Sequence, residues 1–124
     1  MRNKNYLIIF IILIGGLIGF LIWQGNKNNQ ASPALIAFAR CLTEKEAIVY
    51  GTDSCEWCQK QKADFKSAWQ FIKYVNCVND PQTCTSLNIE STPTWIFQGG
   101  KRLVGYQQLD SLSEASGCPI TETK

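Results

Sequence analysis

Histidine is absent from the 124 residues of this chain. Its absence excludes Ser-His-Asp and Cys-His catalysis, because both need an imidazole as general base, and it excludes metal sites that need an imidazole ligand. Charged residues are also few, at 18%, whereas hydrophobic residues make up 45%. That balance is typical of a folded chain and excludes disordered and collagen-like classes. The length suits one small domain.

An excess of charge of one sign is lacking as well. The formal net charge is +2, from 12 basic and 10 acidic residues. Two of the basic residues, Arg2 and Lys4, precede a long apolar run, so the remainder holds 10 basic and 10 acidic residues. A neutral domain without a basic stripe argues against nucleic acid as a partner.

The apolar run extends from Tyr6 to Trp23 and holds 18 residues without a charge, YLIIFIILIGGLIGFLIW. As a helix it would be about 27 Å long, close to the ~30 Å hydrocarbon core of a bilayer. Tyr6 and Trp23 stand at its ends, where amphipathic rings favour the membrane interface. We therefore expect a membrane anchor at residues 6–23.

Basic residues flanking this run predict its orientation. Arg2 and Lys4 precede it and Lys27 alone follows closely, which places residues 1–5 in the cytoplasm and the remainder outside the cytoplasmic (inner) membrane, in a single-pass arrangement. A cleaved signal peptide is the alternative. Its apolar region would be shorter and would end near a small-x-small site. The next such pattern, Ala37-Phe38-Ala39, lies well beyond the run, which favours an uncleaved anchor.

The rest of the chain alternates helical and strand patterns. Residues 24–32 are polar and predict a linker, and residues 33–124 predict one folded domain. We expect a mixed-sheet α/β arrangement, a βαβ unit followed by a β-hairpin and a helix. The expected elements are a helix from Pro33, a strand at 47–50, a helix from about Cys55 capped within 52–54, a strand at 72–76, a helix at 80–87, strands at 94–97 and 102–104, and a helix through Leu109 and Leu112 that ends at Gly117. The helix from about Cys55 is expected to carry Cys58, Phe65, Ala68 and Trp69 on one apolar face.

Six cysteines demand an explanation, and the sharpest motif among them is Cys55-Glu56-Trp57-Cys58. Two cysteines three positions apart on the first turn of a helix can close a disulfide. The start of a helix also favours a thiolate at the first cysteine. We therefore expect Cys55 to attack disulfides and Cys58, one turn deeper, to resolve the mixed disulfide.

A second motif is Ser91-Thr92-Pro93-Thr94-Trp95, which begins a strand. We expect a cis Thr92–Pro93 bond beside the dithiol, leaving the backbone open to an extended substrate. The alternative is an ordinary trans proline at a strand edge. Trp57 is expected to be exposed and to contact a partner, and Trp95 to lie in the core.

Together these features resemble the thioredoxin fold, and more narrowly the thioredoxin-like domain fused to bacterial vitamin K epoxide reductase (VKOR) homologues. The resemblance covers residues 35 to about 119. The matching segments are Leu42-Thr43-Glu44-Lys45, Tyr50-Gly51, Cys55 to Cys58 with Lys62, Tyr74-Val75-Asn76-Cys77, Cys84, Pro93-Thr94-Trp95, Gly105 and Ser116-Gly117.

The resemblance implies a dithiol that passes oxidising equivalents between substrate proteins and a quinone-linked membrane partner. Three departures qualify it. One anchor replaces the family's four-helix quinone-reducing domain, so a VKOR-like partner would be a separate protein. Glu-Trp replaces the usual Pro-His, and the negative charge of Glu56 should raise the pKa of Cys55 and favour a reductase. Val49 stands where thioredoxins keep a buried acid, which leaves water or Glu56 to transfer protons.

The remaining cysteines form two further pairs by position. Cys77 and Cys84 enclose a short loop and would be either a structural disulfide or a second dithiol that relays to Cys55 and Cys58. Cys41 and Cys118 lie at the ends of the first and last helices of the domain and are absent from the family pattern. We expect them to pair with each other, the alternatives being free thiols or a link to a partner.

Three functions follow from these motifs. The favoured one is a membrane-anchored extracytoplasmic thiol–disulfide oxidoreductase, acting as oxidant or isomerase on protein thiols and disulfides without a cofactor. The first alternative is a reductase of protein thiols, as in cytochrome or metal-site maturation. The second is a non-catalytic module with stapled or metal-bound cysteines. Zinc or copper binding is disfavoured, because the spacing of Cys77 and Cys84 is too long for a zinc knuckle.

Overall fold

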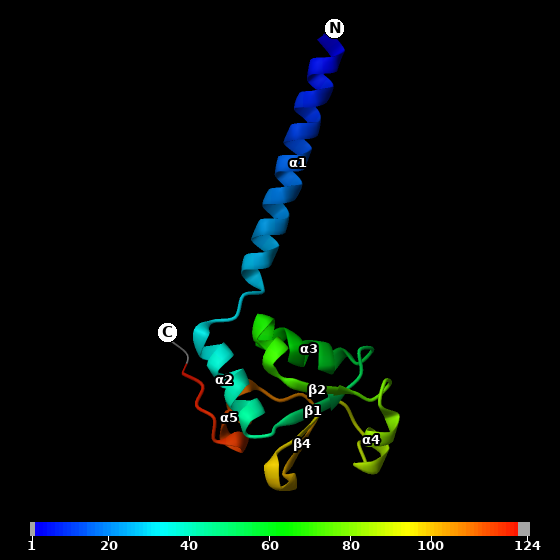
Figure 1. Cartoon of the computed structure of the whole chain (residues 1–124), viewed down its shortest axis with the longest axis vertical. Helices are drawn as coiled ribbons and strands as arrows, with labels where there is room; N and C mark the ends of the chain where they lie inside the picture. Colours follow the sequence, from blue (N-terminus) through cyan, green and yellow to red (C-terminus); the bar gives the residue numbers. More distant parts are fainter. Residues whose placement is uncertain (1, 122–124) are drawn as a thin grey trace. The chain divides into compact units, whose positions relative to one another are not determined.

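The structure is a computed structural model that describes residues 2–121. The chain divides into two compact units, Met1–Gln30 and Ala31–Lys124 (Figure 1).

The first unit is the helix α1, Arg2–Asn28. Among the described residues it is the one helix long and apolar enough to cross a membrane, with a mean hydropathy of 2.7 over its most apolar window, and it is consistent with a single anchor. The helix continues past Trp23 into the segment expected to be a linker. No proline interrupts residues 24–28, and the Lys27 ammonium lies 3.7 Å from the Trp23 ring centroid, an i,i+4 contact that supports the last turn.

The second unit is built on a four-stranded mixed sheet of order β2-β1-β3-β4. Its strands are β1 (Ile48–Gly51), β2 (Lys73–Asn76), β3 (Thr94–Ile96) and β4 (Arg102–Val104). The β1–β2 pair is parallel, and the β1–β3 and β3–β4 pairs are antiparallel. The mixed α/β architecture expected from the sequence is thereby confirmed.

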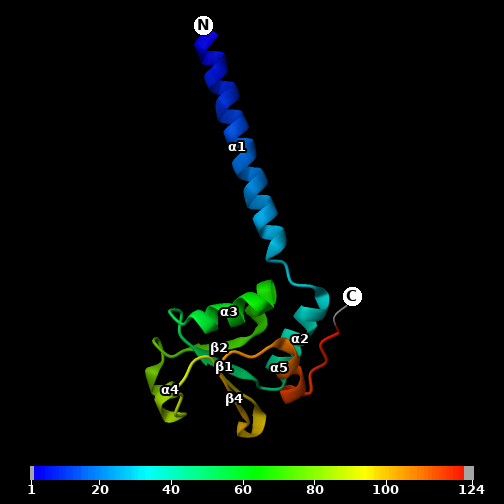
Figure 2. The ribbon, with the colours of Figure 1, turned by 180° about the vertical axis from the view of Figure 1, so that it is seen from behind.

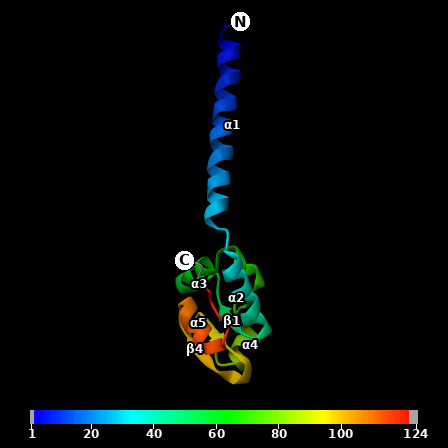
Figure 3. The ribbon, with the colours of Figure 1, turned by 90° about the vertical axis from the view of Figure 1, so that its left-hand side faces the viewer.

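Helices follow the expected order: α2 (Pro33–Glu44), α3 (Glu56–Phe65), α4 (Pro81–Ser86) and α5 (Leu109–Ser116). In Figure 1, α3 lies above β1 and β2, and Figure 3 shows α2 and α5 next to each other. Figure 2 shows the β3–β4 hairpin and α4 from behind. Local signals account for the ends: Ser32 caps α2, Asp80 caps α4, and Gly117 ends α5 in the left-handed conformation.

The helix after β1 differs from expectation in two ways. Its N-cap is Cys55 itself, not Thr52, Asp53 or Ser54. It also ends at Phe65, because Lys66 takes a φ of 51°, and the chain goes on as the 3₁₀ helix η1, Lys66–Phe71. The apolar spacing read as one helical face still holds in part, since Ala68 on η1 is buried with Phe65.

The core lies against the face of the sheet that carries Val49 and Trp95. These two residues are register partners on β1 and β3 and are almost completely buried. Phe65 of α3 joins this layer: its ring centroid lies 6.1 Å from that of Trp95 and 6.1 Å from that of Phe38 on α2. This packing fixes α3, and with it the two cysteines at its start, against β1.

Candidate functional site

The site begins where β1 ends and α3 starts. Cys55 is the N-cap of α3 and has extended backbone dihedrals, φ −80° and ψ 117°. Its Sγ accepts a hydrogen bond from the Cys58 backbone N–H at 3.2 Å, so sulfur takes the place of the usual capping oxygen. The same Sγ lies 3.4 Å from the Thr92 carbonyl oxygen, to which the thiol donates.

These contacts control the ionisation of Cys55. Burial acts to raise the pKa of its thiol, but hydrogen bonds from the side chains of Cys58 and Thr92 and from the N–H groups of Trp57 and Cys58 outweigh it. The pKa of Cys55 therefore lies below its ordinary value. The sequence suggested the opposite from Glu56, whose carboxylate is not among the groups that set this pKa.

Cys58 has the opposite character. It faces the sheet with 2% of its surface exposed. Burial first, and then its hydrogen bond to Cys55, raise the pKa of the Cys58 thiol above its ordinary value. The pair thus combines a partly exposed sulfur that ionises easily with a buried one that resists ionisation. In the structure neither sulfur takes part in a disulfide.

The Thr92–Pro93 segment lies beside Cys55, as its 3.4 Å contact with the Thr92 carbonyl shows. The Thr92–Pro93 peptide bond is cis. Pro93 is almost fully buried, and its carbonyl accepts a hydrogen bond from the Gly105 N–H at 2.7 Å. The loop before β3 and the loop after β4 therefore meet next to the dithiol.

An aromatic pair borders the same place. Trp57 is 55% exposed, and its ring centroid lies 5.9 Å from that of Tyr106. Trp57, Thr92, Gly105 and Tyr106 line a cavity at the surface. Sequence reasoning gave Tyr106 no role beyond packing. The hydroxyl of Tyr106 donates to the Asp64 carboxylate on α3, a long-range contact that no local pattern reveals.

A polar cluster on the other side of the dithiol was also missed. The Asp53 carboxylate accepts hydrogen bonds from Lys62 Nζ at 2.8 Å and from Asn76 Nδ2 at 2.7 Å. The Tyr74 hydroxyl donates to the same carboxylate at 3.5 Å. Lys62 first, with later contributions from Tyr74 and Asn76, holds the pKa of Asp53 below its ordinary value. The sequence pointed to Lys62, Tyr74 and Asn76 only as positions that carry the family resemblance, and it assigned them no contact with Asp53.

The other four cysteines are paired. Cys41 bonds to Cys118 with an S–S distance of 2.08 Å, and Cys77 bonds to Cys84 at 2.05 Å. Cys118 belongs to the hydrophobic core cluster. Cys77 directly follows β2, and its N–H donates to the Gly51 carbonyl at 2.8 Å, so the shorter disulfide is tied to the end of β1 that leads to Cys55.

Comparison with protein families adds no assignment. No family model matches the chain. Within residues 2–121, no group of three or more His, Cys, Asp or Glu side chains is placed to hold a metal ion. The site is therefore interpreted from its own chemistry.

Proposed function

We propose that this chain is a membrane-anchored thiol–disulfide oxidoreductase with a thioredoxin-like fold. The observation that carries the proposal is the contrast between Cys55 and Cys58. Cys55 has a lowered pKa and lies at a helix start, whereas Cys58 is 2% exposed with a raised pKa. A thiolate is the attacking species in disulfide exchange, so this arrangement makes Cys55 the nucleophile and Cys58 the resolving thiol.

The reaction exchanges one disulfide for another. In the oxidising direction a substrate thiolate attacks Cys55 Sγ of the Cys55–Cys58 disulfide, and the electron pair of that bond passes to Cys58. A second substrate thiolate then attacks the mixed disulfide and Cys55 leaves. The substrate gains a disulfide and loses two electrons, which the Cys55–Cys58 dithiol holds. Thr92 and Pro93, beside Cys55, would align the substrate backbone, and Trp57 would contact it.

Oxidation of the dithiol then requires a second protein. We propose a VKOR-like, quinone-linked membrane protein that accepts the two electrons. The helix α1 would hold the domain near such a partner, with residues 1–5 in the cytoplasm and the domain outside. The lowered pKa of Cys55 supports the oxidising direction, because stabilising the thiolate stabilises the reduced form.

Substitution of Cys55 tests the activity. The full chain in detergent, with its Cys55–Cys58 pair oxidised, is given a reduced peptide with two cysteines, and disulfide formation in the peptide is followed by mass spectrometry. Cys55→Ser should abolish transfer. The double variant Cys77→Ser/Cys84→Ser should keep it if that pair is structural. Unchanged exchange in Cys55→Ser would refute the proposal and leave a non-catalytic module.

The direction of transfer is tested by the reduction potential of the Cys55–Cys58 pair in glutathione buffers. We expect a value of about −120 to −180 mV, the range of oxidants and isomerases. A value near about −270 mV would instead identify a reductase of protein thiols, the alternative left open by the sequence.

A further inference from the structure

Cys58 presents a physical problem for any exchange reaction at this site. When the Cys55–Cys58 bond breaks, its electron pair goes to the Cys58 sulfur, which is 2% exposed. A buried thiolate is costly unless a charge or a hydrogen-bond donor stabilises it. The position of a buried acid is taken by Val49, and Glu56 is exposed at the start of α3. Burial, which raises the pKa of Cys58, outweighs the Thr52 backbone and the Thr92 side chain, which lower it, so a further donor would be needed to stabilise this sulfur as a thiolate.

Tyr74 on β2 comes close to Cys58 at Gly51. A Cβ added to Gly51 would lie 2.9 Å from Cys58 Sγ, 3.0 Å from Tyr74 Cε2 and 3.4 Å from the Tyr74 hydroxyl. The thiol and the phenol edge thus converge on one point, and the absence of a side chain at Gly51 leaves it open. Tyr74 and Val49 are register partners on β2 and β1, so they share the sheet face covered by α3.

The Tyr74 hydroxyl is only loosely engaged elsewhere. Its bond to the Asp53 carboxylate is 3.5 Å long, at the outer limit for a hydrogen bond. That carboxylate already receives much shorter bonds from Lys62 and Asn76. The hydroxyl can therefore turn from Asp53 to a neighbouring anion without leaving the carboxylate unsatisfied.

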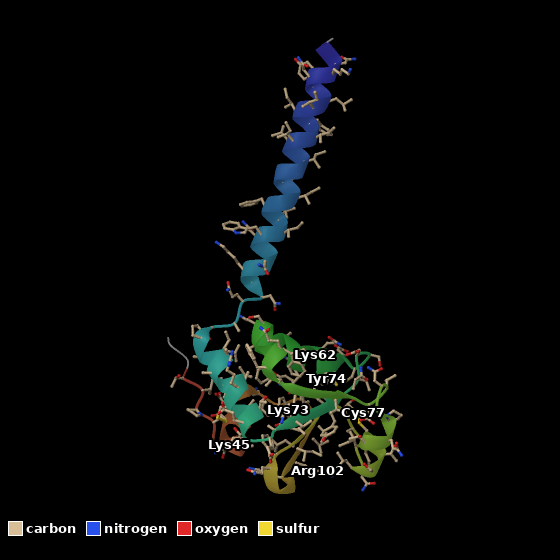
Figure 4. The ribbon with its side chains drawn as sticks, in the orientation of Figure 1. Lys45, Lys62, Lys73, Tyr74, Cys77 and Arg102 are labelled. Atoms are coloured by element: carbon tan, nitrogen blue, oxygen red, sulfur yellow. A yellow bond between two sulfur atoms is a disulfide. The ribbon has the colours of Figure 1, made fainter. Side chains whose placement is uncertain are left out.

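Lys62 adds a positive charge to the same place. Its ammonium lies 4.3 Å from the Tyr74 ring centroid, and Figure 4 shows the two side chains together between α3 and β2. The Lys62 side chain is 22% exposed and the Asp53 side chain is 67% exposed. The cation is thus the more sheltered member of the ion pair, which favours a negative charge nearby.

Resting on the function proposed above, we propose that Tyr74 is the positioning residue for Cys58. Its hydroxyl turns from Asp53 to the Cys58 sulfur and donates a hydrogen bond as that sulfur becomes a thiolate. Lys62 and Asn76 hold Asp53 while this happens. The tyrosine thereby takes over the role of the buried acid of thioredoxins at the second cysteine, but as a hydrogen-bond donor that keeps its proton.

The step balances without a further reactant. The attacking thiolate forms a bond to Cys55 Sγ, the Cys55–Cys58 bond breaks, and its electron pair stays on Cys58, which later takes a proton from solvent. Tyr74 remains a neutral donor throughout. Burial first, and then the charge of Asp53, raise the pKa of Tyr74 to about 12. The Cys58 thiol contacts Cys55 at the N-cap of α3, the backbone of Thr52 and the side chain of Thr92, and its charge acts on Tyr74 of β2.

Removing one oxygen atom tests this role. Oxidised full-length chain in detergent is mixed with dithiothreitol between pH 5.5 and 9, quenched with acid and analysed for the Cys55–Cys58 peptide. Tyr74→Phe keeps the ring and should slow reduction at pH 7 by at least about tenfold, the worth of a hydrogen bond to a charged group. Tyr50→Phe, a buried tyrosine on the opposite face of β1, is the matched control and should stay within about twofold.

A second measurement separates positioning from structure. At pH 7 the resolving thiol ends protonated, so the equilibrium constant of Tyr74→Phe with glutathione should change by less than about twofold while both rates fall. Asp53→Asn removes the competing acceptor charge and should react at least as fast as wild type. Unchanged rates in Tyr74→Phe, or a joint loss of rate, equilibrium constant and thermal stability, would overturn the proposal.

The assay also separates this inference from the proposed function. Dithiothreitol reduces the Cys55–Cys58 disulfide whether or not the chain has protein substrates. If Tyr74→Phe is reduced at the normal rate while the wild type oxidises the peptide, the role of Tyr74 is refuted and the proposed function stands. If Tyr74→Phe is reduced slowly by dithiothreitol while the wild type exchanges no disulfide with the peptide, the proposed function is refuted and the role of Tyr74 stands.

Discussion

The thiols of Cys55 and Cys58 differ in acidity because Cys55 lies at the N-terminus of a helix and Cys58 lies on the buried face of the same helix. Cys55 gains backbone N–H contacts that only an N-cap position offers. Cys58 lies one turn further along, against β1, and loses its hydration. The same short motif therefore yields two thiols whose pKa values shift in opposite directions.

This contrast predicts selective alkylation of the reduced pair. The pKa of Cys55 is lowered and that of Cys58 is raised, so Cys55 should form a thiolate at lower pH than an ordinary cysteine and Cys58 only at higher pH. We expect iodoacetamide to modify Cys55 with a midpoint below that of an unperturbed cysteine and to modify Cys58 far more slowly. Peptide mapping across pH 5 to 10 measures both rates. Equal rates at the two positions would contradict the assignment.

Gly51 is a second residue whose importance lies in its environment. Its backbone does not need a positive φ, yet an added Cβ would lie 2.9 Å from Cys58 Sγ and 3.0 Å from the Tyr74 ring. Gly51→Ala should therefore destabilise the domain by about 1–3 kcal/mol through overpacking and should displace Cys58. Thermal unfolding measures the first effect and the rate of reduction by dithiothreitol the second.

Gly25→Ala is the control for that change, because nothing lies within 4 Å of the carbon it would add. It should leave both measurements unchanged. A fully stable Gly51→Ala chain with normal reduction kinetics would show that the end of β1 yields to accommodate the methyl group.

At the scale of elements, α3 is held to the β3–β4 side of the sheet by one buried amide. Gln61 is 0% exposed. Its Oε1 accepts from Trp95 Nε1 at 3.2 Å and from the Gln107 N–H at 2.9 Å, and its Nε2 donates to the Gln107 carbonyl at 3.0 Å. The loop that carries Tyr106 is thereby fixed relative to the helix that carries Trp57.

Gln61→Leu should be among the most damaging single substitutions in the domain. It keeps the volume but leaves the Trp95 indole and the Gln107 backbone without partners, at a cost of about 1–3 kcal/mol for each buried group. Denaturant unfolding measures the loss. Gln59→Leu is the matched control: the Gln59 side chain is exposed and donates to the Asp53 carbonyl, and its loss should change stability by about 0.5 kcal/mol or less. Equal losses in the two variants would contradict the role of Gln61.

Elements were more predictable than the contacts between them. Ser32-Pro33, Asp80-Pro81 and Gly117 are local stop and start signals, and α2, α4 and α5 begin or end at them. The end of α3 was missed because Lys66, with a φ of 51°, carries no signal of the left-handed region. The polar cluster at Asp53 was missed for a different reason. Its members come from a loop, α3 and β2, and only the parallel β1–β2 pairing brings them together.

At the scale of the whole molecule, the chain combines an exposed apolar helix with a small domain closed by two disulfides. The Cys41–Cys118 bond spans 77 positions and joins α2 to the segment after α5, whereas Cys77–Cys84 spans 7. A crosslink restricts the unfolded chain more when it closes a longer loop. The two bonds should therefore contribute unequally to the stability of the same domain.

Removing each bond tests this relation. Cys41→Ala/Cys118→Ala should lower the free energy of unfolding by about 4–5 kcal/mol and Cys77→Ala/Cys84→Ala by about 2–3 kcal/mol, following loop length. Denaturant unfolding of both variants with the Cys55–Cys58 pair kept reduced gives the comparison. Equal losses, or a larger loss from the short loop, would mean that local packing around Cys77 and Gly51 outweighs chain entropy. In that event the short disulfide would support the end of β1, and its loss would also slow exchange at Cys55.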